Sequence, residues 1–374
     1  MSSEPVFNRA ARILRSVSPD TPADEALRRE LGAQRTLAPS EKRAVTRAVF
    51  AYYRWLRWLD SSASLQAQLA AAADLQRRFD ADPASVKTEA LAARAVPDWL
   101  RDELALTPDY LRSLQRDPAL WIRVQTEFAG SVPRALGDCT AAPAPAAGTG
   151  FRYTGTKDLF RSEEFQKGLF EIQDLASQLV GHACAPQPGE TWWDACAGEG
   201  GKTLHLADLM QNKGLIWATD RSARRLATLR RRAGRAQVFN YRSLPWNGGP
   251  FLPTKTKFDG ILVDAPCSGV GTWQRNPHAR WTTTADDVRE LAALQLQLLN
   301  HVAGSLKPGG RLVYAVCTLT RSETTAVVDP FATAHPELEP LPLASLGAMQ
   351  NTFVVQPHEW NANGMFIAAW TRKK

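Results

Sequence analysis

The second half of the chain alternates short apolar runs with segments of helical period. The first run, at residues 191–196, is followed by a Gly-rich turn and a helix. Runs of this length are typical of strands buried on both faces, as in a parallel sheet covered by helices. Further strands are predicted at residues 215–220, 237–239, 258–264, 310–316, 353–355 and 365–370. We therefore predict a parallel, doubly wound α/β sheet, which binds ligands beyond the carboxyl ends of its strands.

The first third of the chain has the period of helices. Residues 6–17 repeat apolar side chains at helical spacing, and residues 21–25 are typical of a helix start, with a capping threonine and a proline in the first turn. A longer helix is predicted over residues 40–59, capped by its first serine. Trp55 and Trp58 lie among the arginines of that helix. Burial in a small helical core is favoured for them over stacking on nucleic-acid bases.

The stretch from residue 140 to residue 150 is rich in alanine, proline and glycine and has no periodicity. Such a composition predicts a linker between domains. A length of 374 residues also suggests two or three domains. We therefore expect a helical domain at residues 1–118, a connecting segment that ends in the linker at residues 119–150, and an α/β domain at residues 151–374.

The composition of the chain indicates the cellular compartment in which the protein is expected. The chain has 44% hydrophobic residues, no apolar run near the ~20 residues of a membrane helix, and no signal-peptide core after Met1. We expect a soluble, cytoplasmic protein without a membrane partner. The five cysteines include no CxxC pair, and the six histidines include no H-x-x-x-H pair. This distribution predicts reduced thiols, and neither a disulfide scaffold nor a metal site.

Positive charge is concentrated in one short segment. The formal net charge is only +7, but seven arginines fall within residues 221–235. A solvated helix face is the favoured interpretation, because such runs are common. Nucleic acid becomes the better hypothesis for a partner only if a second feature agrees.

The turn after the first predicted strand is rich in glycine and contains one acidic residue. A phosphate-binding loop would need glycine where Cys196 stands, and a dinucleotide fingerprint would need a third glycine where Thr203 stands. Glu199 would also repel a phosphate. S-adenosylmethionine has a positively charged end and no phosphate, so it suits this turn better. The turn residues expected to bind it are Cys196, Ala197, Gly198, Glu199, Gly200, Gly201 and Lys202.

Chemically active side chains follow three of the predicted strands. Asp220 ends the second strand, where a carboxylate binds ribose hydroxyls in this architecture; a plain helix cap is the alternative role. Cys267 follows the fourth strand, just after Asp264, and Cys317 follows the fifth. A lone cysteine after a strand is usually a small core residue. Two of them at one edge, beside a carboxylate, favour chemistry.

Several strings in the chain resemble the motifs of one enzyme family, the Sun (RsmB/NOP-type) RNA cytosine carbon-5 methyltransferases. Residues 194–203 are similar to its first cofactor motif, residues 264–281 (DAPCSGVGTWQRNPHARW) to its fourth, and residues 306–323 to its sixth. Residues 121–124 and 165–179 also resemble the family. The resemblance therefore covers nearly the whole chain.

The resemblance implies a Rossmann-like class I S-adenosylmethionine-dependent methyltransferase domain, preceded by an all-helical domain. Residues 23–60 look like the NusB-type RNA-binding domain of some bacterial members, so residues 1–118 are expected to bind RNA. The implied reaction transfers a methyl group from S-adenosylmethionine to carbon 5 of a cytosine in RNA. Ribosomal RNA is the expected partner, and a monomer is the expected state.

The resemblance also implies a role for each candidate catalytic residue. Carbon 5 of cytosine is a poor nucleophile, and attack of a thiolate on carbon 6 makes it reactive. Cys317 is the implied nucleophile, and Cys267 assists release of the product. Asp264 is expected to stabilise charge at ring nitrogen 3 and to contribute to the cofactor site.

The chain departs from the family pattern at a few positions, which are Gly198-Glu199 in place of Ala-Pro, Val316 in place of Thr, His278 in place of Asp, and Asn240 near an expected carboxylate.

Three alternatives to an RNA methyltransferase acting on ribosomal RNA are open. A non-catalytic RNA-binding protein on a methyltransferase fold is disfavoured by intact Cys317, Cys267, Asp264 and Lys202. A methyltransferase of DNA is disfavoured by the upstream segment and the NusB-like region. A methyltransferase of tRNA is the remaining alternative.

Overall fold

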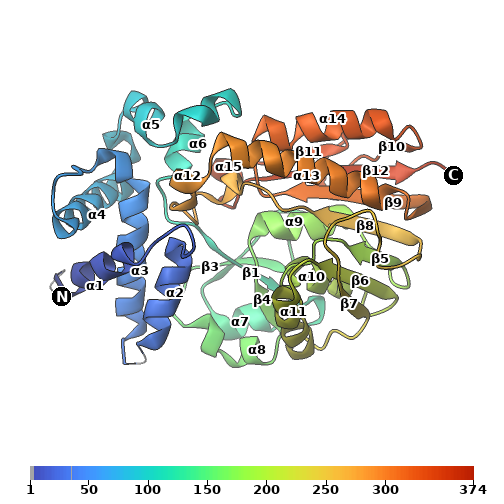
Figure 1. The fold of residues 1–374 in the computed structure, drawn as a ribbon. Coiled ribbons are helices and arrows are strands. Elements are labelled where there is room, and N and C mark those ends of the chain that lie inside the picture. The colour runs from blue at the N-terminus through green and yellow to red at the C-terminus, as the bar shows by residue number, and fades with distance from the viewer. Residues whose placement is uncertain (1–3, 35) are drawn as a thin grey trace. The chain divides into compact units, whose positions relative to one another are not determined.

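The computed structural model describes residues 4–34 and 36–374, and the chain forms two compact units (Figure 1). The helical unit contains residues 1–118 and 269–285, and the α/β unit contains residues 119–268 and 286–374. The sequence features predicted at residues 1–3 lie outside the described residues. The chain therefore passes between the units at three points, and one of them interrupts a sequence motif.

The helical unit has a small apolar core. Its helices are α1 (Glu4–Arg15), α2 (Ala23–Ala33), α3 (Pro39–Arg54), α4 (Leu65–Ala81), α5 (Thr88–Arg94), α6 (Pro108–Ser113) and α12 (Ala279–Thr282). Trp55 is fully buried and packs edge to face against Trp58 and Phe79, with ring centroids 5.1 and 5.7 Å away. The prediction that the two tryptophans belong to a helical core is therefore confirmed.

Two predicted helix caps are wrong. No side chain caps α2, whose N-cap position is occupied by Pro22. The N-cap of α3 is Ala38, and the carboxylate of Glu41 accepts a hydrogen bond from its backbone N–H at 3.0 Å. Proline at the first helical position moves the cap to the residue before it, so Ser40 lies inside the first turn. The helix also ends at Arg54, and a 3₁₀ turn at Leu56–Trp58 follows.

The predicted linker is wrong, because residues 119–150 belong to the α/β unit. They contribute to a four-stranded antiparallel sheet in the order β2 (Cys139–Ala141), β3 (Gly150–Tyr153), β1 (Leu120–Val124) and β4 (Phe170–Ile172). Helices α7 (Val132–Leu136) and α8 (Glu163–Gln166) accompany it. Ala142 and Ala146 are buried in the core, and the backbone N–H of Gly150 donates to the Ala146 carbonyl at 2.8 Å. The stretch is thus an ordered loop between two strands of one sheet rather than a linker between domains.

The large sheet confirms the predicted doubly wound α/β architecture. Its order is β10 (Leu338–Pro340), β12 (Met365–Arg372), β9 (Leu306–Val316), β8 (Phe258–Asp264), β5 (Thr191–Asp194), β6 (Leu215–Asp220) and β7 (Tyr241–Pro245), and β11 (Thr352–Val355) pairs with β12. Trp192 and Trp193 point to opposite faces and enter two separate apolar clusters. Helices α9 (Leu175–Cys184), α10 (Gly201–Leu209) and α11 (Ala223–Arg235) cover one face. Helices α13 (Ala285–Ala303) and α14 (Thr325–Ala334) cover the other.

Two details of the large sheet differ from prediction. The third strand is β7 at Tyr241–Pro245 rather than residues 237–239, and Phe239 is 76% exposed in the preceding loop. The five strands from β9 to β7 are parallel, but β12 runs antiparallel to β9, and β10 and β11 run antiparallel to β12. Only the short helix α15 (Pro357–Trp360) separates β11 from β12, which is too short for the crossover that a parallel pair needs.

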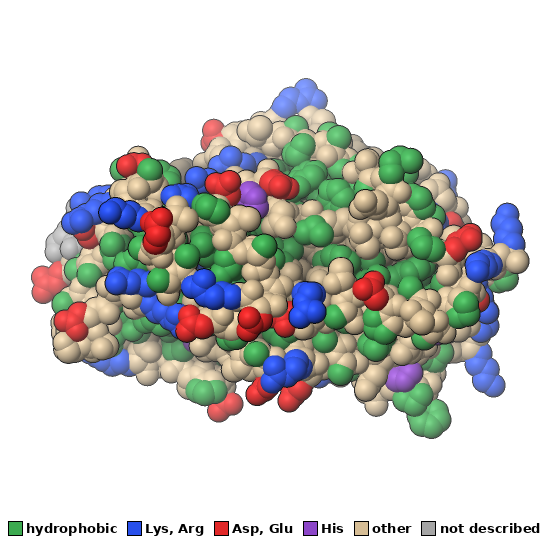
Figure 2. Space-filling model, turned by 90° about the horizontal axis from the view of Figure 1, so that it is seen from above, with side chains coloured by type: hydrophobic (Ala, Val, Ile, Leu, Met, Phe, Trp, Pro, Cys, Tyr) green, Lys and Arg blue, Asp and Glu red, His purple; other side chains and the backbone are tan. Residues whose placement is uncertain are grey.

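The surface carries charges of both signs. On the face seen in Figure 2, Lys and Arg side chains are interspersed with Asp and Glu side chains. In the described part of the chain, no helix combines the length and the apolar character needed to span a membrane.

Candidate active site

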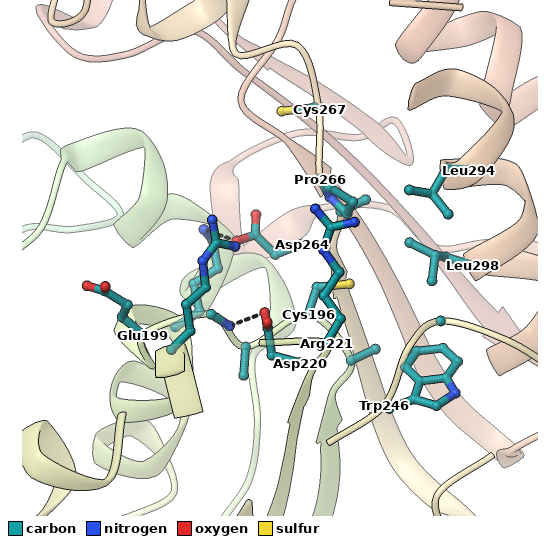
Figure 3. A pocket seen from close by; sticks show the side chains of 18 of the residues that line it. Cys196, Glu199, Asp220, Arg221, Trp246, Asp264, Pro266, Cys267, Leu294 and Leu298 are labelled. Atoms are coloured by element: carbon teal, nitrogen blue, oxygen red, sulfur yellow. Dashed lines mark hydrogen bonds and ion pairs between the residues drawn. The ribbon is translucent and has the colours of Figure 1, made fainter. Parts of the chain in front are cut away.

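A cavity of about 480 Å³ lies at the carboxyl ends of the parallel strands, where the doubly wound fold predicts a ligand site (Figure 3). This volume lies within the range of small-molecule sites, about 300–1,000 Å³. Every lining residue belongs to the α/β unit. They are Ser177, Ala195, Cys196, Ala197, Gly198, Glu199, Gly201, Lys202, Asp220, Arg221, Arg225, Trp246, Asn247, Gly248, Asp264, Ala265, Pro266, Cys267, Leu294, Leu298 and Cys317.

Asp220 joins the ends of β5 and β6. One of its carboxylate oxygens accepts the backbone N–H of Gly198 at 3.0 Å, and the other accepts the N–H of Ser222 at 2.7 Å. The cap of α11 is Ser222 itself, whose hydroxyl accepts the N–H of Arg225. The alternative role of Asp220 as a plain helix cap is therefore wrong. Its carboxylate lines the cavity and holds the Gly-rich turn in place (Figure 3).

Two glycines of the turn have different roles. Gly198 has a φ of 56° and lines the cavity. Gly200 has a φ of 87°, and a Cβ there would approach the Leu229 side chain to 2.6 Å. Gly200 is absent from the lining of the cavity among the described residues, although the sequence predicted a cofactor contact. The structure thus requires glycine at position 200 for close packing of the turn against α11, and the other six predicted turn residues line the cavity.

The two candidate catalytic cysteines meet in the cavity. Their Sγ atoms are 3.2 Å apart, because β8 and β9 are adjacent parallel strands that end at the same edge. With Cys267 as donor, this hydrogen bond lowers the pKa of Cys317, and the positive charge of Lys202 acts in the same direction against burial and Asp264. The environment therefore favours a thiolate at Cys317.

Lys202 and Asp264 form an ion pair beside the thiols. Lys202 Nζ donates to Asp264 Oδ2 at 2.7 Å (Figure 3). Burial alone would lower the pKa of Lys202, but the ion pair raises it above its ordinary value. Lys202 therefore stays protonated at neutral pH and supplies a fixed positive charge near Cys317.

Glu323, which the sequence placed only within a family motif, connects the loops that carry the two cysteines. Its buried carboxylate accepts four hydrogen bonds, from the backbone N–H and the hydroxyl of Ser268, from the Gln295 amide and from the Thr320 hydroxyl. Gln295 also donates to the Pro266 carbonyl at 2.9 Å. Because Ser268 follows Cys267 and Thr320 lies three residues after Cys317, this carboxylate fixes the spacing of the thiols.

Asp194, at the end of β5, is fully buried behind the Gly-rich turn. Burial is the main reason that its pKa rises to about 7, although a hydrogen bond from Thr203 at 2.7 Å opposes the rise. Its Oδ1 has no hydrogen-bond partner among the described residues. Burial likewise raises the pKa of the Cys196 thiol, so that Cys196 is a neutral lining residue rather than a second nucleophile.

The sequence missed the part of the cavity that follows β7. Trp246, Asn247 and Gly248 line it, because they stand at the carboxyl end of that strand. The predicted position of the strand was a few residues too early and directed attention to Asn240. That residue is buried before β7 and is absent from the cavity lining. Residues 241–245 (YRSLP) show no apolar-polar alternation, so no local pattern in the sequence marked β7 or Asn247.

The fold and the site define a class of protein, the Rossmann-like methyltransferases. The crystal structure of PH0851 has the same fold, with a TM-score of 0.82 and 24% identity over 100% of both chains. The family model of the 16S rRNA methyltransferases RsmB/F matches residues 182–371, just over half of the chain.

Two curated relatives agree with the family model. The ribosomal RNA small subunit methyltransferase B of Shewanella oneidensis is 30% identical over 316 residues, which cover 79% of this chain and 70% of that protein. The probable ribosomal RNA small subunit methyltransferase B of Bacillus subtilis is 35% identical over 223 residues, which cover 56% of this chain and 49% of that protein. The chain belongs to the RsmB/F methyltransferase family, and its match spans about half of the length of the Bacillus relative.

Proposed function

We propose that this protein transfers a methyl group from S-adenosylmethionine to carbon 5 of a cytosine in ribosomal RNA, through a covalent adduct with Cys317. The observation that carries the proposal is the 3.2 Å separation of the Cys267 and Cys317 thiols inside a cavity that also holds Lys202 and Asp264. Two cysteines in a packed core would need no buried ion pair beside them. A nucleophilic site needs one to stabilise the thiolate.

The lining of the cavity fits S-adenosylmethionine. Asp220 ends β6, and its carboxylate can bind ribose hydroxyls, while the acidic Gly-rich turn suits a ligand with a positive end. When bound, S-adenosylmethionine would supply an electrophilic methyl group to carbon 5, with the thioether S-adenosylhomocysteine as the leaving group. Asp220→Ala should weaken its binding by roughly 1–3 kcal/mol, the scale of a charged hydrogen bond. Calorimetry on the full chain measures this, and binding of NAD or ATP instead would contradict the assignment of the cofactor.

In the proposed reaction, Cys317 acts first. Its thiolate forms a bond to carbon 6 of the cytosine, and the electron pair of the 5,6 double bond shifts into the ring, so that carbon 5 becomes nucleophilic. The Oδ1 atom of Asp264 makes no hydrogen bond within the described residues and is available to ring nitrogen 3, while Oδ2 is held by Lys202. A proton shared between Oδ1 and ring nitrogen 3 neutralises the negative charge that the attack places on the ring.

Cys267 acts last. After methylation, the proton on carbon 5 must leave before the bond between Cys317 and carbon 6 can break. The Cys267 thiol lies beside Cys317; it first releases its own proton to solvent, and the resulting thiolate then accepts the proton from carbon 5. The electron pair of the C5–H bond then re-forms the 5,6 double bond and expels the Cys317 thiolate. Both thiols thereby return to their starting state.

Ribosomal RNA is the proposed substrate because the relatives named above carry that substrate in their names. The mouse tRNA (cytosine(72)-C(5))-methyltransferase NSUN6 is 37% identical over 194 residues, which makes tRNA the second candidate. Bisulfite sequencing of total RNA from cells with and without the gene distinguishes the two. A cytosine in ribosomal RNA should lose protection, whereas a loss confined to tRNA would select the second candidate.

The proposal also needs a direct test of catalysis. The purified protein, RNA from cells that lack the gene and methyl-tritiated S-adenosylmethionine should give labelled RNA, with RNA from wild-type cells as a matched control that is already methylated. Failure to label RNA, in protein that binds S-adenosylmethionine, would favour the non-catalytic alternative.

A further inference from the structure

One segment of the α/β unit is strongly basic and contains no acidic residue. Between Asp220 and Asp259 there are ten Lys and Arg residues and no Asp or Glu. The segment builds α11, the edge strand β7 and the loop that leads to β8. Helix α11 packs against β7, which is the edge strand of the large sheet (Figure 1).

The seven arginines in and beside α11 divide into two groups. Arg232 and Arg235 form ion pairs with the buried carboxylate of Glu171, and the Arg232 pair has a length of 2.9 Å. Arg232 also donates to the Glu199 carbonyl at 3.0 Å. These two guanidinium groups therefore attach α11 to β4 and to the Gly-rich turn.

The other five arginines are exposed and form no ion pair with any residue that the structure describes; they are Arg221, Arg224, Arg225, Arg230 and Arg231. Some exposed cations of the same unit outside this segment are paired, since Arg161, Lys167 and Arg289 each pair with a carboxylate three or four residues away, whereas scattered single ones such as Arg152 and Lys213 form no ion pair within the described residues. Five uncompensated charges within eleven residues repel one another, and an anionic partner would relieve that repulsion.

Exposed aromatic rings lie in the same segment. Phe239 is 76% exposed and Phe251 is 91% exposed. An exposed ring is unfavourable in water but can stack on an unpaired base. Arg242 is not counted with the exposed arginines, because its guanidinium lies over the Trp217 ring at 5.7 Å.

The segment is continuous with the candidate active site. Arg221, Arg225 and Trp246 belong to it and line the cavity that contains Cys267 and Cys317. An RNA chain that delivers a flipped base to these thiols must leave the cavity along some surface of the protein. The basic segment begins with a residue, Arg221, that lines the cavity.

We propose that residues 221–257 form the surface that binds the single-stranded RNA flanking the target base. The exposed arginines contact phosphates, and Phe239 and Phe251 stack on unpaired bases. Single-stranded RNA is favoured over duplex because paired bases present no free faces to the two rings. This inference rests on the proposed function and adds the location of substrate binding, which the sequence had assigned to the helical domain.

The first test removes charge. In the full chain, the triple variant Arg224→Ala, Arg230→Ala and Arg231→Ala is compared with the control Arg161→Ala, Lys167→Ala and Arg289→Ala, which removes as many exposed positive charges. Binding of a cytosine-containing single-stranded RNA oligonucleotide is measured at several salt concentrations. The α11 variant should lower the slope of log K against log salt by about 2, since each phosphate contact on a single strand contributes about 0.7. The control should change neither slope nor affinity.

An unchanged slope and affinity in the α11 variant would overturn the proposal. Retained binding of S-adenosylmethionine shows that this variant is folded, because none of its three changed residues lines the cavity. In the methyl-transfer assay, KM for RNA should rise in the α11 variant and stay at the wild-type value in the control variant. If the wild-type protein itself labels no RNA, the proposed function fails, whereas loss of the slope difference alone defeats only this inference.

The second test removes the rings. Phe239→Ala and Phe251→Ala should each weaken RNA binding by roughly 5- to 150-fold with no change in the salt slope, the scale of one stacked base. Phe160→Ala is the control, because Phe160 is 60% exposed but lies outside the segment. Equal effects of all three changes would contradict stacking by this segment. If polyglutamate displaces the bound RNA oligonucleotide as effectively as unlabelled RNA of equal charge does, the assignment to RNA is overturned and an acidic protein partner is indicated.

Discussion

The helical unit and the α/β unit both bury charged side chains, but they use them differently. In the helical unit, the Arg280 guanidinium donates to the carbonyls of Ala95 at 2.9 Å and Leu114 at 2.8 Å, at the carboxyl ends of α5 and α6. In the α/β unit, the Lys202–Asp264 pair faces a cavity with two thiols. A buried charge therefore marks a reactive site only when its surroundings leave room for a ligand.

The contrast between the two units is clearest within one sequence motif. Residues 264–281 resemble a single family motif, yet residues 264–268 belong to the α/β unit and residues 269–281 to the helical unit. The first part supplies Asp264 and Cys267 to the cavity. The second part supplies Arg280 and Trp281 to helix packing, where the Trp281 indole donates to the Tyr53 carbonyl at 2.6 Å. One motif thus serves chemistry at one end and folding at the other.

The largest expected effect is the different outcome of substituting each of the two cysteines. Cys317→Ala should abolish methyl transfer, because no adduct forms. Cys267→Ala should permit attack and transfer but block release, so that RNA stays attached to Cys317. A denaturing gel should then show a slow-migrating protein–RNA band for Cys267→Ala that depends on S-adenosylmethionine and is absent in the double mutant.

Two outcomes would change this view of the cysteines. A band with Cys317→Ala only would reverse their roles and make Cys267 the nucleophile. Full activity of both single mutants would exclude the covalent mechanism, and the two thiols would be packing residues whose loss leaves only a small cavity.

The next effect concerns Arg280, whose role should be structural. Burial lowers its pKa to about 9, so it is charged at neutral pH and its partners are all backbone carbonyls. Arg280→Met should lower the free energy of unfolding of the helical unit by about 2–6 kcal/mol, because two buried carbonyls lose their donor at a cost of about 1–3 kcal/mol each. Urea unfolding measures this. Arg275→Met is the control, since Arg275 is exposed in the same segment. Equal stability of the two variants would contradict the assigned role.

A third prediction concerns Asp194 and pH. Its pKa rises from the ordinary 3.8 to about 7 in the folded state, mainly through burial. The folded protein therefore binds this proton more tightly, and the associated stability is complete below pH 3.8 and lost as pH rises toward 7. The loss is on the order of 1.4 kcal/mol per pH unit within that window. Asp194→Asn should be less sensitive to pH than the wild type in urea unfolding at pH 5 and 7.5, and parallel curves would refute the prediction.

The smallest of these effects concerns Glu323, which should act through the cysteines. Glu323→Ala should lower kcat by roughly 100-fold, the scale of a 1 Å misplacement of reacting groups, with little change in the affinity for S-adenosylmethionine. The kcat of Glu323→Gln should lie between those of the wild type and Glu323→Ala, because the Ser268 and Thr320 hydroxyls can rotate to accept hydrogen bonds from the new amide.

A readout specific to positioning is the pH dependence of Cys317 alkylation. The negative charge of Glu323 raises the pKa of Cys317, so its removal alone should lower the midpoint in Glu323→Ala; a rise of the midpoint instead would show that the hydrogen bond from Cys267, which lowers this pKa, depends on Glu323. An unmoved midpoint together with reduced stability would show that Glu323 only supports the fold.

Local patterns in the sequence determined much of this protein. The strands β5, β6, β8 and β9 were predicted because their apolar runs need burial on both faces. The turn after β5 and the residues Asp220, Asp264, Cys267 and Cys317 follow from their positions at the ends of those strands, because parallel strands expose their carboxyl ends at one edge. No long-range information was needed for these assignments.

The tertiary structure decided what depends on partners distant in the chain. Residues 140–150 have the composition of a linker, but pairing of β2 with β3 makes them the connection between two strands of one sheet. Phe239 has the apolar character of a strand residue, but β7 begins after it and leaves it exposed. The seven arginines beside and in α11 are alike in sequence, and only Glu171, some sixty residues earlier in the chain, separates two structural arginines from five exposed ones. Composition and periodicity describe a residue's own preferences, whereas its partners are set by the fold.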